Sequence, residues 1–399
     1  MLNISEPNPS IKSGIALWQL GFRPFFIGAA SFSVIAMIVW MGIYLFQWPM
    51  PLLNINPVLW HAHEMLFGYA LAVIAGFLLA AVKNWTGQQT INGTKLGILF
   101  SIWASARLLP ILNIGSIEIV ALLDCLFILS TGIAVAIPII KVKQWAQTGV
   151  LAILLTMFIS NVIYYTGLLG FIENGDRIGI YSCFYLVLTL IFVMGRRVIP
   201  FFIERGVNAN ISLNNRKWLD NSSMILLIAL WIIDVLQIQV QIAGALAGVL
   251  FILHTIRLFD WHTKLLWKSS MLWVLYIAYS FLTFGFALKA ASIWLDVSPF
   301  ISIHAFTVGG IGILTLGMMS RVTLGHTGRN VQQPPRGLSI AFMLLLASAF
   351  VRVILPLLFA DQYSSWIAIS QILWIAGFGM FIILFIPMLI KPRIDGQPG

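Results

Sequence analysis

Long apolar runs follow one another along the whole chain, and short polar connections separate them. Each run has about 20 residues, enough for an α-helix to cross the ~30 Å of hydrocarbon in a bilayer. The pattern predicts an all-α, polytopic membrane protein of about 12 transmembrane helices, in a single membrane domain over residues 1–399. The expected spans are 25–46, 63–82, 95–113, 117–140, 149–171, 178–200, 221–237, 240–259, 270–292, 300–320, 337–359 and 366–390.

The composition supports this class and adds an orientation. Hydrophobic residues make up 60% of the chain and charged residues only 9%, whereas a soluble domain carries roughly a quarter. Cations gather in every second connection, and the alternate connections carry acidic residues such as Glu64, Glu118 and Asp361. This positive-inside bias predicts cytoplasmic termini, with residues 1–24 as a cytoplasmic N-terminal segment and 391–399 as a cytoplasmic tail. The net charge of +10 therefore reflects topology, and we expect no nucleic-acid partner.

Two distant segments carry one spaced pattern. The first runs from His63 through Gly68 and Gly76 to Gly87, and the second from His304 through Gly309 and Gly317 to Gly328. Each leads into a further span with an arginine near its far end, Arg107 or Arg352. The copies lie eight spans apart, which predicts a parallel internal repeat of spans 1–4 and 9–12, with a weak middle copy in spans 5–8. Close helix packing explains the glycines, but it does not explain the histidines and arginines.

The histidines of the two copies are the main candidates for chemistry. A polar side chain inside hydrocarbon is costly and usually functional, so we expect a metal or a haem between His63 and His304. His61 lies two positions from His63, about 200° around an α-helix, and faces the opposite side. It could serve a second centre, or it could only form hydrogen bonds at the membrane interface.

The two arginines need anionic partners, because an unpaired guanidinium is expensive in a membrane. The propionates of a haem would suit Arg107 and Arg352, since arginine binds carboxylates in a bidentate manner. Protein carboxylates are the alternative, and the candidates are Glu118, Asp124 and Asp234. His326 belongs to the cytoplasmic boundary, where water is available, and is only a weak candidate metal ligand.

Several longer motifs resemble those of the NnrS family, and the resemblance extends over essentially the whole chain. They are Leu20-Gly21-Phe22-Arg23-Pro24-Phe25-Phe26, Trp60-His61-Ala62-His63-Glu64-Met65-Leu66-Phe67-Gly68, Gly76-Phe77-Leu78-Leu79-Ala80-Ala81-Val82, Asn84-Trp85-Thr86-Gly87 and Ser320-Arg321-Val322-Thr323-Leu324-Gly325-His326-Thr327-Gly328-Arg329. The resemblance implies a haem- and copper-containing bacterial inner-membrane protein, associated with nitric oxide metabolism and resistance to nitrosative stress. A b-type haem and an electron donor of unknown identity are expected with it.

The expected repeat also resembles the architecture of haem–copper oxidases and nitric oxide reductases. Those enzymes have twelve helices in three arcs of four, and a low-spin haem lies between their second and tenth helices. Here the doubled histidine is on span 2, where those enzymes double it on span 10, and the histidines of the middle arc are missing. The analogy therefore concerns architecture only.

The leading hypothesis from the sequence is a membrane redox protein with a haem between spans 2 and 10, acting in nitric oxide metabolism. The alternative is a transporter or sensor that uses the histidines as proton or metal stations. The parallel repeat argues against that alternative, because many transporter folds are built from inverted repeats.

Overall fold

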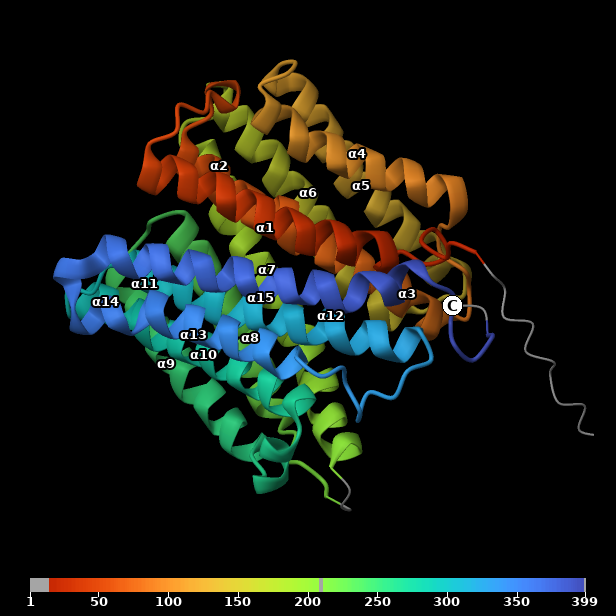
Figure 1. Ribbon diagram of the computed structural model, residues 1–399. Coiled ribbons are helices and arrows are strands. Elements are labelled where there is room, and N and C mark those ends of the chain that lie inside the picture. Colours follow the sequence, from red (N-terminus) through yellow and green to blue (C-terminus); the bar gives the residue numbers. More distant parts are fainter. Residues whose placement is uncertain (1–13, 208–210, 398–399) are drawn as a thin grey trace, which may run out of the picture.

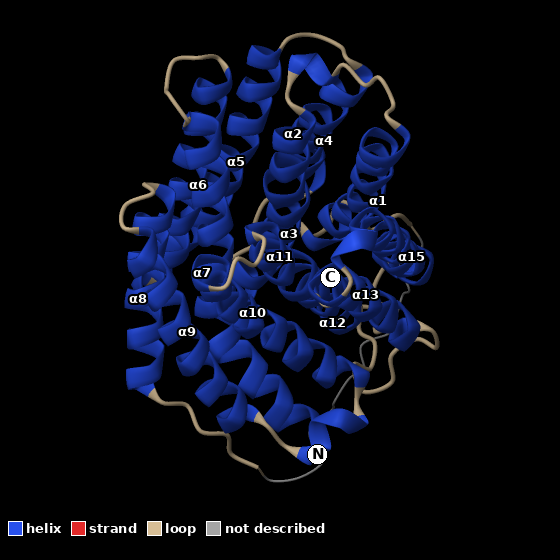
Figure 2. Cartoon of the chain, turned by 90° about the vertical axis from the view of Figure 1, so that its left-hand side faces the viewer, coloured by secondary structure: helices blue, strands red, loops and turns tan. Residues whose placement is uncertain are grey.

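The computed structural model describes residues 14–207 and 211–397. Residues 1–13 of the expected N-terminal segment and residues 398–399 of the expected tail lie outside the described residues. Within the described ranges the protein is 81% helical. Figure 2 shows helices joined by loops, with no strand in the part of the chain that the structure describes. Twelve helices are long and apolar enough to cross a membrane, which confirms the all-α, polytopic prediction.

Ten of the spans are built mainly from one helix each. They are α1 (Phe22–Phe46), α4 (Gly93–Leu112), α5 (Ile117–Lys141), α6 (Thr148–Leu168), α7 (Gly175–Gly206), α8 (Lys217–Val235), α9 (Val240–Trp261), α10 (Ser270–Trp294), α13 (Leu338–Val353) with the short α14 (Leu355–Leu358), and α15 (Tyr363–Ile390). Single 3-10 turns precede some of them: η1 (Leu52–Asn54), η3 (Trp145–Gln147), η4 (Lys264–Lys268) and η6 (Ala360–Gln362).

The second and tenth spans are composite, and they are built alike. Each begins with a short α-helix, α2 (Pro57–His63) or α11 (Pro299–His304), that has proline in its first turn. A π-helix follows, η2 (Glu64–Ala70) or η5 (Ala305–Gly312), and then a longer α-helix, α3 (Leu71–Thr86) or α12 (Ile313–His326). Proline suits a helix start because its missing N–H has no partner there. The structure thus extends the expected spans 63–82 and 300–320 at both ends and places His61 and His326 inside helices.

Helices that are neighbours in sequence pack side by side, and the last span returns to the first. The α13–α15 and α1–α15 contacts close this ring, and Figure 1 shows α1 (red) lying beside α15 (blue). The second, sixth and tenth spans meet inside it through contacts between η2 and α7 and between α3 and α12. These are also the three most deeply buried spans. Units of four spans would give this arrangement, although the duplication itself stays a prediction.

The outer surface of the bundle is apolar. Large exposed side chains such as Leu122, Ile225 and Ile383 project from helices of the ring. A soluble monomer rarely exposes so much contiguous apolar surface, but a lipid bilayer covers it. The protein is therefore a multi-pass membrane protein with a lipid environment.

Candidate functional site

One cavity inside the bundle combines imidazoles with guanidiniums. It has a volume of about 470 Å³ and lies between α1, α2, η2, α7, α11, η5, α13 and α15. His61, His304, Arg177 and Arg352 line it, together with mostly apolar and aromatic side chains. Among the described residues no carboxylate contributes to this lining. The cavity lies where α2 and α11 begin, the end of the bundle that faces the viewer in Figure 2.

His304 directs the lone pair of one ring nitrogen toward Arg352 at the cavity. It is the last residue of α11, and its Nδ1 lies 2.6 Å from the carbonyl oxygen of Phe300, one turn earlier. A carbonyl can only accept, so Nδ1 carries the hydrogen and Nε2 carries the lone pair. Arg352 donates to this Nε2 at 3.4 Å. A backbone bond that fixes one ring nitrogen and frees the other is typical of histidines that bind metals.

His61 lines the same cavity from the second span. Its ring stacks on Trp40 of α1, with centroids 4.6 Å apart and an angle of 10° between the planes. Its Nδ1 is buried without a hydrogen-bond partner among the described residues. A buried polar atom left in that state is unfavourable, so the side chain lacks the hydrogen bonds expected of a purely structural histidine.

Two guanidiniums supply the cationic part of the lining. Arg352 contacts the hydroxyl of Tyr363 at 3.2 Å, and within the described part of the chain its second terminal nitrogen is buried without a partner. Arg177 of α7 donates to the carbonyl oxygens of Val235 and Asp234, at 2.8 and 3.0 Å. Neither arginine forms an ion pair with a described carboxylate. The cavity is therefore suited to a ligand that carries negative charge.

His63 does not line this cavity with His304, and its ring nitrogens meet other side chains. The Nε2 of His63 lies 2.9 Å from the Asn161 amide oxygen and 3.3 Å from Asp124, and its Nδ1 lies 3.3 Å from Glu64. All four side chains are buried. The reason is the helical rotation of about 200° between positions two apart, which allows only one of His61 and His63 to face the cavity. The prediction that these two histidines have opposite surroundings is confirmed.

Arg107 belongs to this second polar cluster and does not line the cavity. It donates to Glu64 at 2.8 Å and also pairs with Asp124. Of the two alternatives that the sequence left open, the structure supports a protein carboxylate, Asp124. Gly68 makes the cluster possible, because a Cβ there would lie 2.7 Å from a Glu64 oxygen and 3.1 Å from the Arg107 side chain.

The remaining metal candidates lie elsewhere. His326 ends α12 beside Phe22, roughly 30 Å along the span from His304. Over residues 14–207 and 211–397 the structure has no group of three or more histidine, cysteine or acidic side chains that could hold a metal ion. The expected copper therefore has no ligand set here and stays a prediction.

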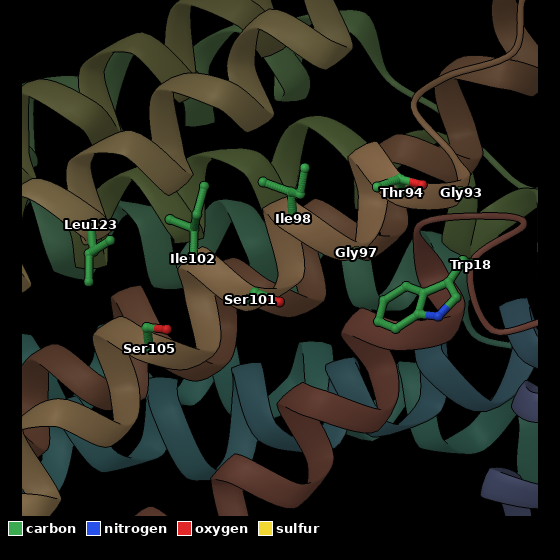
Figure 3. A pocket seen from close by; sticks show the side chains of 9 residues that line it. All are labelled: Trp18, Gly93, Thr94, Gly97, Ile98, Ser101, Ile102, Ser105 and Leu123. Atoms are coloured by element: carbon green, nitrogen blue, oxygen red, sulfur yellow. The ribbon is translucent and has the colours of Figure 1, made fainter.

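A second hollow lies on the outside of α4 and has a different character. It is lined by Trp18, by Leu123 of α5 and by residues of α4, among them Gly93, Gly97 and Ser101, and Figure 3 shows the small side chains of α4 along it. Its described lining contains no histidine and no charged residue. We therefore assign no chemistry to it.

Sequence reasoning missed Arg177 and misplaced Glu64. Arg177 is a rare cation among connections that are otherwise acidic, and that exception was its signal. Glu64 was counted as a connection residue, yet it is buried in η2. Glu64 could have been recognised from Arg107 and Asp124 on neighbouring spans, because charges inside membranes pair with one another.

Comparison with known proteins bears on what this arrangement is for. The family model described as NnrS protein matches residues 16–393, nearly the whole chain. No curated protein matches the chain. The family is associated with nitric oxide metabolism. The matched range contains both composite spans and both polar sites, and the chain belongs to the NnrS protein family.

Proposed function

We propose that this protein is a haem-containing redox protein of nitric oxide metabolism, with the haem in the cavity between the second and tenth spans. His61 and His304 would hold the haem iron, and Arg352 and Arg177 would pair with the propionates. This choice keeps the two spans expected from the sequence but replaces His63 by His61 and Arg107 by Arg177.

The observation that carries the proposal is the composition of the cavity. Two imidazoles and two guanidiniums share one apolar space, and no described carboxylate lines it. The volume of about 470 Å³ falls within the ~300–1,000 Å³ of small-molecule and cofactor sites. The partnerless nitrogens of His61 and Arg352 supply binding groups that the described residues leave unused.

The residues around the cavity would bind and orient the group. The bond from His304 Nδ1 to Phe300 sets the ring orientation and keeps Nε2 unprotonated. Trp40 fixes the plane of the His61 ring, and the apolar lining excludes water. A haem held there would supply one-electron transfer.

The visible absorption spectrum and the iron, copper and haem contents of the purified protein test this proposal. We expect about one haem per chain and a reducible Soret band. Addition of nitric oxide to the reduced protein then separates two roles, since a shifted band indicates direct binding and an unshifted band indicates electron transfer. A protein without haem, isolated from cells that supply it, would contradict the proposal and favour a transporter or sensor.

A further inference from the structure

A second buried histidine pairs with a tyrosine, away from the cavity. His254 of α9 places its Nδ1 2.6 Å from the hydroxyl oxygen of Tyr279 on α10. Arg257 lies one turn after His254 and contacts the same oxygen at 3.0 Å. All three side chains are at least 97% buried. Water is therefore excluded, and the hydrogen bonds of the phenol are set by the protein alone.

The donors and acceptors of this cluster can be assigned. A guanidinium can only donate, so Arg257 donates to the Tyr279 oxygen. Within the described residues the only recorded acceptor for the phenolic hydrogen is then His254 Nδ1. The histidine therefore carries its own hydrogen on Nε2, which has no hydrogen-bond partner in the described part of the chain. Tyr279 thus donates a short hydrogen bond to a base that is free to accept its proton.

Aromatic rings connect this pair to the cavity. The His254 ring lies parallel to Phe286 at a centroid distance of 5.4 Å and an angle of 5°. Phe286 contacts Phe306 at 4.9 Å, and Phe306 contacts Phe184 at 5.6 Å. Phe184 lines the cavity. These phenylalanines are buried, so the chain is a continuous dry aromatic contact between the two sites.

We propose that Tyr279 and His254 form a redox-active pair that supplies one electron to a radical nitrogen oxide that reaches the cavity. In this step Tyr279 loses one electron, its O–H bond breaks, and the proton forms a new N–H bond on His254 Nδ1. The electron passes through the aromatic contacts and reduces the oxidant, for example nitrogen dioxide to nitrite. The products are a neutral tyrosyl radical, an imidazolium and the nitrite anion, so charge and atoms balance.

A hydrogen bond to an imidazole sets Tyr279 apart from a tyrosine whose hydroxyl meets only a carbonyl oxygen. Oxidation of a phenol without a base leaves a strongly acidic radical cation, whereas a hydrogen-bonded imidazole takes the proton as the electron leaves. Tyr276 on the same helix offers the matched comparison, because its hydroxyl donates to the carbonyl oxygen of Leu258 at 3.0 Å. A carbonyl accepts a hydrogen bond but is too weak a base to take the proton.

The inference takes from the proposed function only the class of the oxidant, a nitrogen oxide that reaches the cavity. The test uses the full-length protein in lipid nanodiscs, with nitrogen dioxide generated by flash photolysis of nitrate. A scavenger removes the hydroxyl radical that the photolysis also releases. Samples are frozen at successive times and examined by electron paramagnetic resonance. We expect a tyrosyl signal whose hyperfine structure collapses when the protein contains ring-deuterated tyrosine.

Variants test which tyrosine gives the radical signal and whether the electron passes through the aromatic contacts. Tyr279→Phe should abolish it and Tyr276→Phe should preserve it. His254→Phe keeps a stacked ring but removes the base, so the yield should fall. Phe306→Leu interrupts the aromatic contacts and should slow the appearance of the radical. A signal that persists in Tyr279→Phe, or a yield that His254→Phe leaves unchanged, overturns the proposal.

A measurement on the wild-type protein decides the matter if these variants do not fold. With ¹⁵N-labelled histidine, double-resonance spectra of the radical should show coupling to one imidazole nitrogen and its proton, and a radical without that coupling contradicts the pair. His304→Ala removes a proposed haem ligand but leaves the Tyr279–His254 pair intact, so the coupled radical should still form in this variant. If the protein holds no haem but the coupled radical forms, only the proposed function fails.

Discussion

Two histidines two positions apart have different roles because of what each ring meets. His61 stacks on Trp40 and faces a cavity. His63 is enclosed by Glu64, Asp124 and Asn161, so both of its ring nitrogens are engaged. The surroundings of His63 explain its burial as part of a polar network, since satisfied networks rigidify a core. The surroundings of His61 provide no such polar network.

Arg107 is the residue on which the buried polar network depends most. Arg107→Gln leaves Glu64 and Asp124 buried with their charges uncompensated, and breaking a buried pair in this way costs about 3–5 kcal/mol. We expect a loss of that size in the free energy of unfolding, measured in mixed micelles. The control is Arg196→Gln, whose partner Asp220 lies 3.5 Å away at a partly exposed site, where about 0–1 kcal/mol is expected. Equal losses in the two variants would show that the network is not structural.

The cavity arginines should affect haem retention more than folding. Arg352→Gln and Arg177→Gln each remove a cation from the cavity lining, so a carboxylate-bearing ligand loses a charged partner. We expect faster transfer of haem to a scavenger protein in both variants. Arg336 is exposed on a connection, and Arg336→Gln should leave the transfer rate unchanged. Unchanged rates in all three variants would mean that the propionates are held elsewhere.

At the scale of elements, the π-helices set the direction of the residues before them. Each π-helix directly follows a histidine, His63 or His304. A π-helix holds more residues per turn than an α-helix, so it rotates one half of its span relative to the other. Such segments frequently occur at functional sites. We infer that each π-helix fixes the rotation between the two halves of its span at an angle that a continuous α-helix would not give.

Deleting one residue of η5 tests this inference. Removal of Gly310, which has no side chain, should convert the segment toward an α-helix and rotate His304 by roughly 100° relative to α12. We expect loss of the haem absorption with the helical circular dichroism retained. Deletion of Gln333, an exposed residue of the next connection, should change neither. A Gly310 deletion that keeps full haem absorption would show that the π-helix does not position His304.

The sequence predicts where the spans lie along the chain, but it does not predict which face of each span points inward. Apolar length alone predicted twelve crossings, because each must cover the hydrocarbon. Which of His61 and His63 faces inward depends on how the second span packs against α1, α6 and α7, and no local pattern encodes that. The partners of Arg107 were partly predictable, since Asp124 lies on the next span and was considered. Glu64 was overlooked because the expected span began at residue 63, whereas the helix begins at Pro57.

At the scale of the whole molecule, the ring places three spans at the centre and two polar sites around them. The cavity lies between the second, sixth and tenth spans and their neighbours, whereas the Arg107 network involves the second to fifth spans. His63 with Arg107 and His304 with Arg352 occupy equivalent positions in the expected repeat. Only the second pair faces open space. The two histidine–arginine pairs therefore differ in what surrounds them.

The central claim is that His61 and His304 hold one haem in the cavity. The most direct measurement is the low-spin Soret absorption of four purified variants at equal protein concentration. If these two histidines hold the haem, His61→Ala and His304→Ala each lose this absorption, and His262→Ala, at an exposed site, keeps it. Chains of His63→Ala that fold should keep it as well. Loss in folded His63→Ala together with retention in His61→Ala would contradict the account and restore His63 as the ligand.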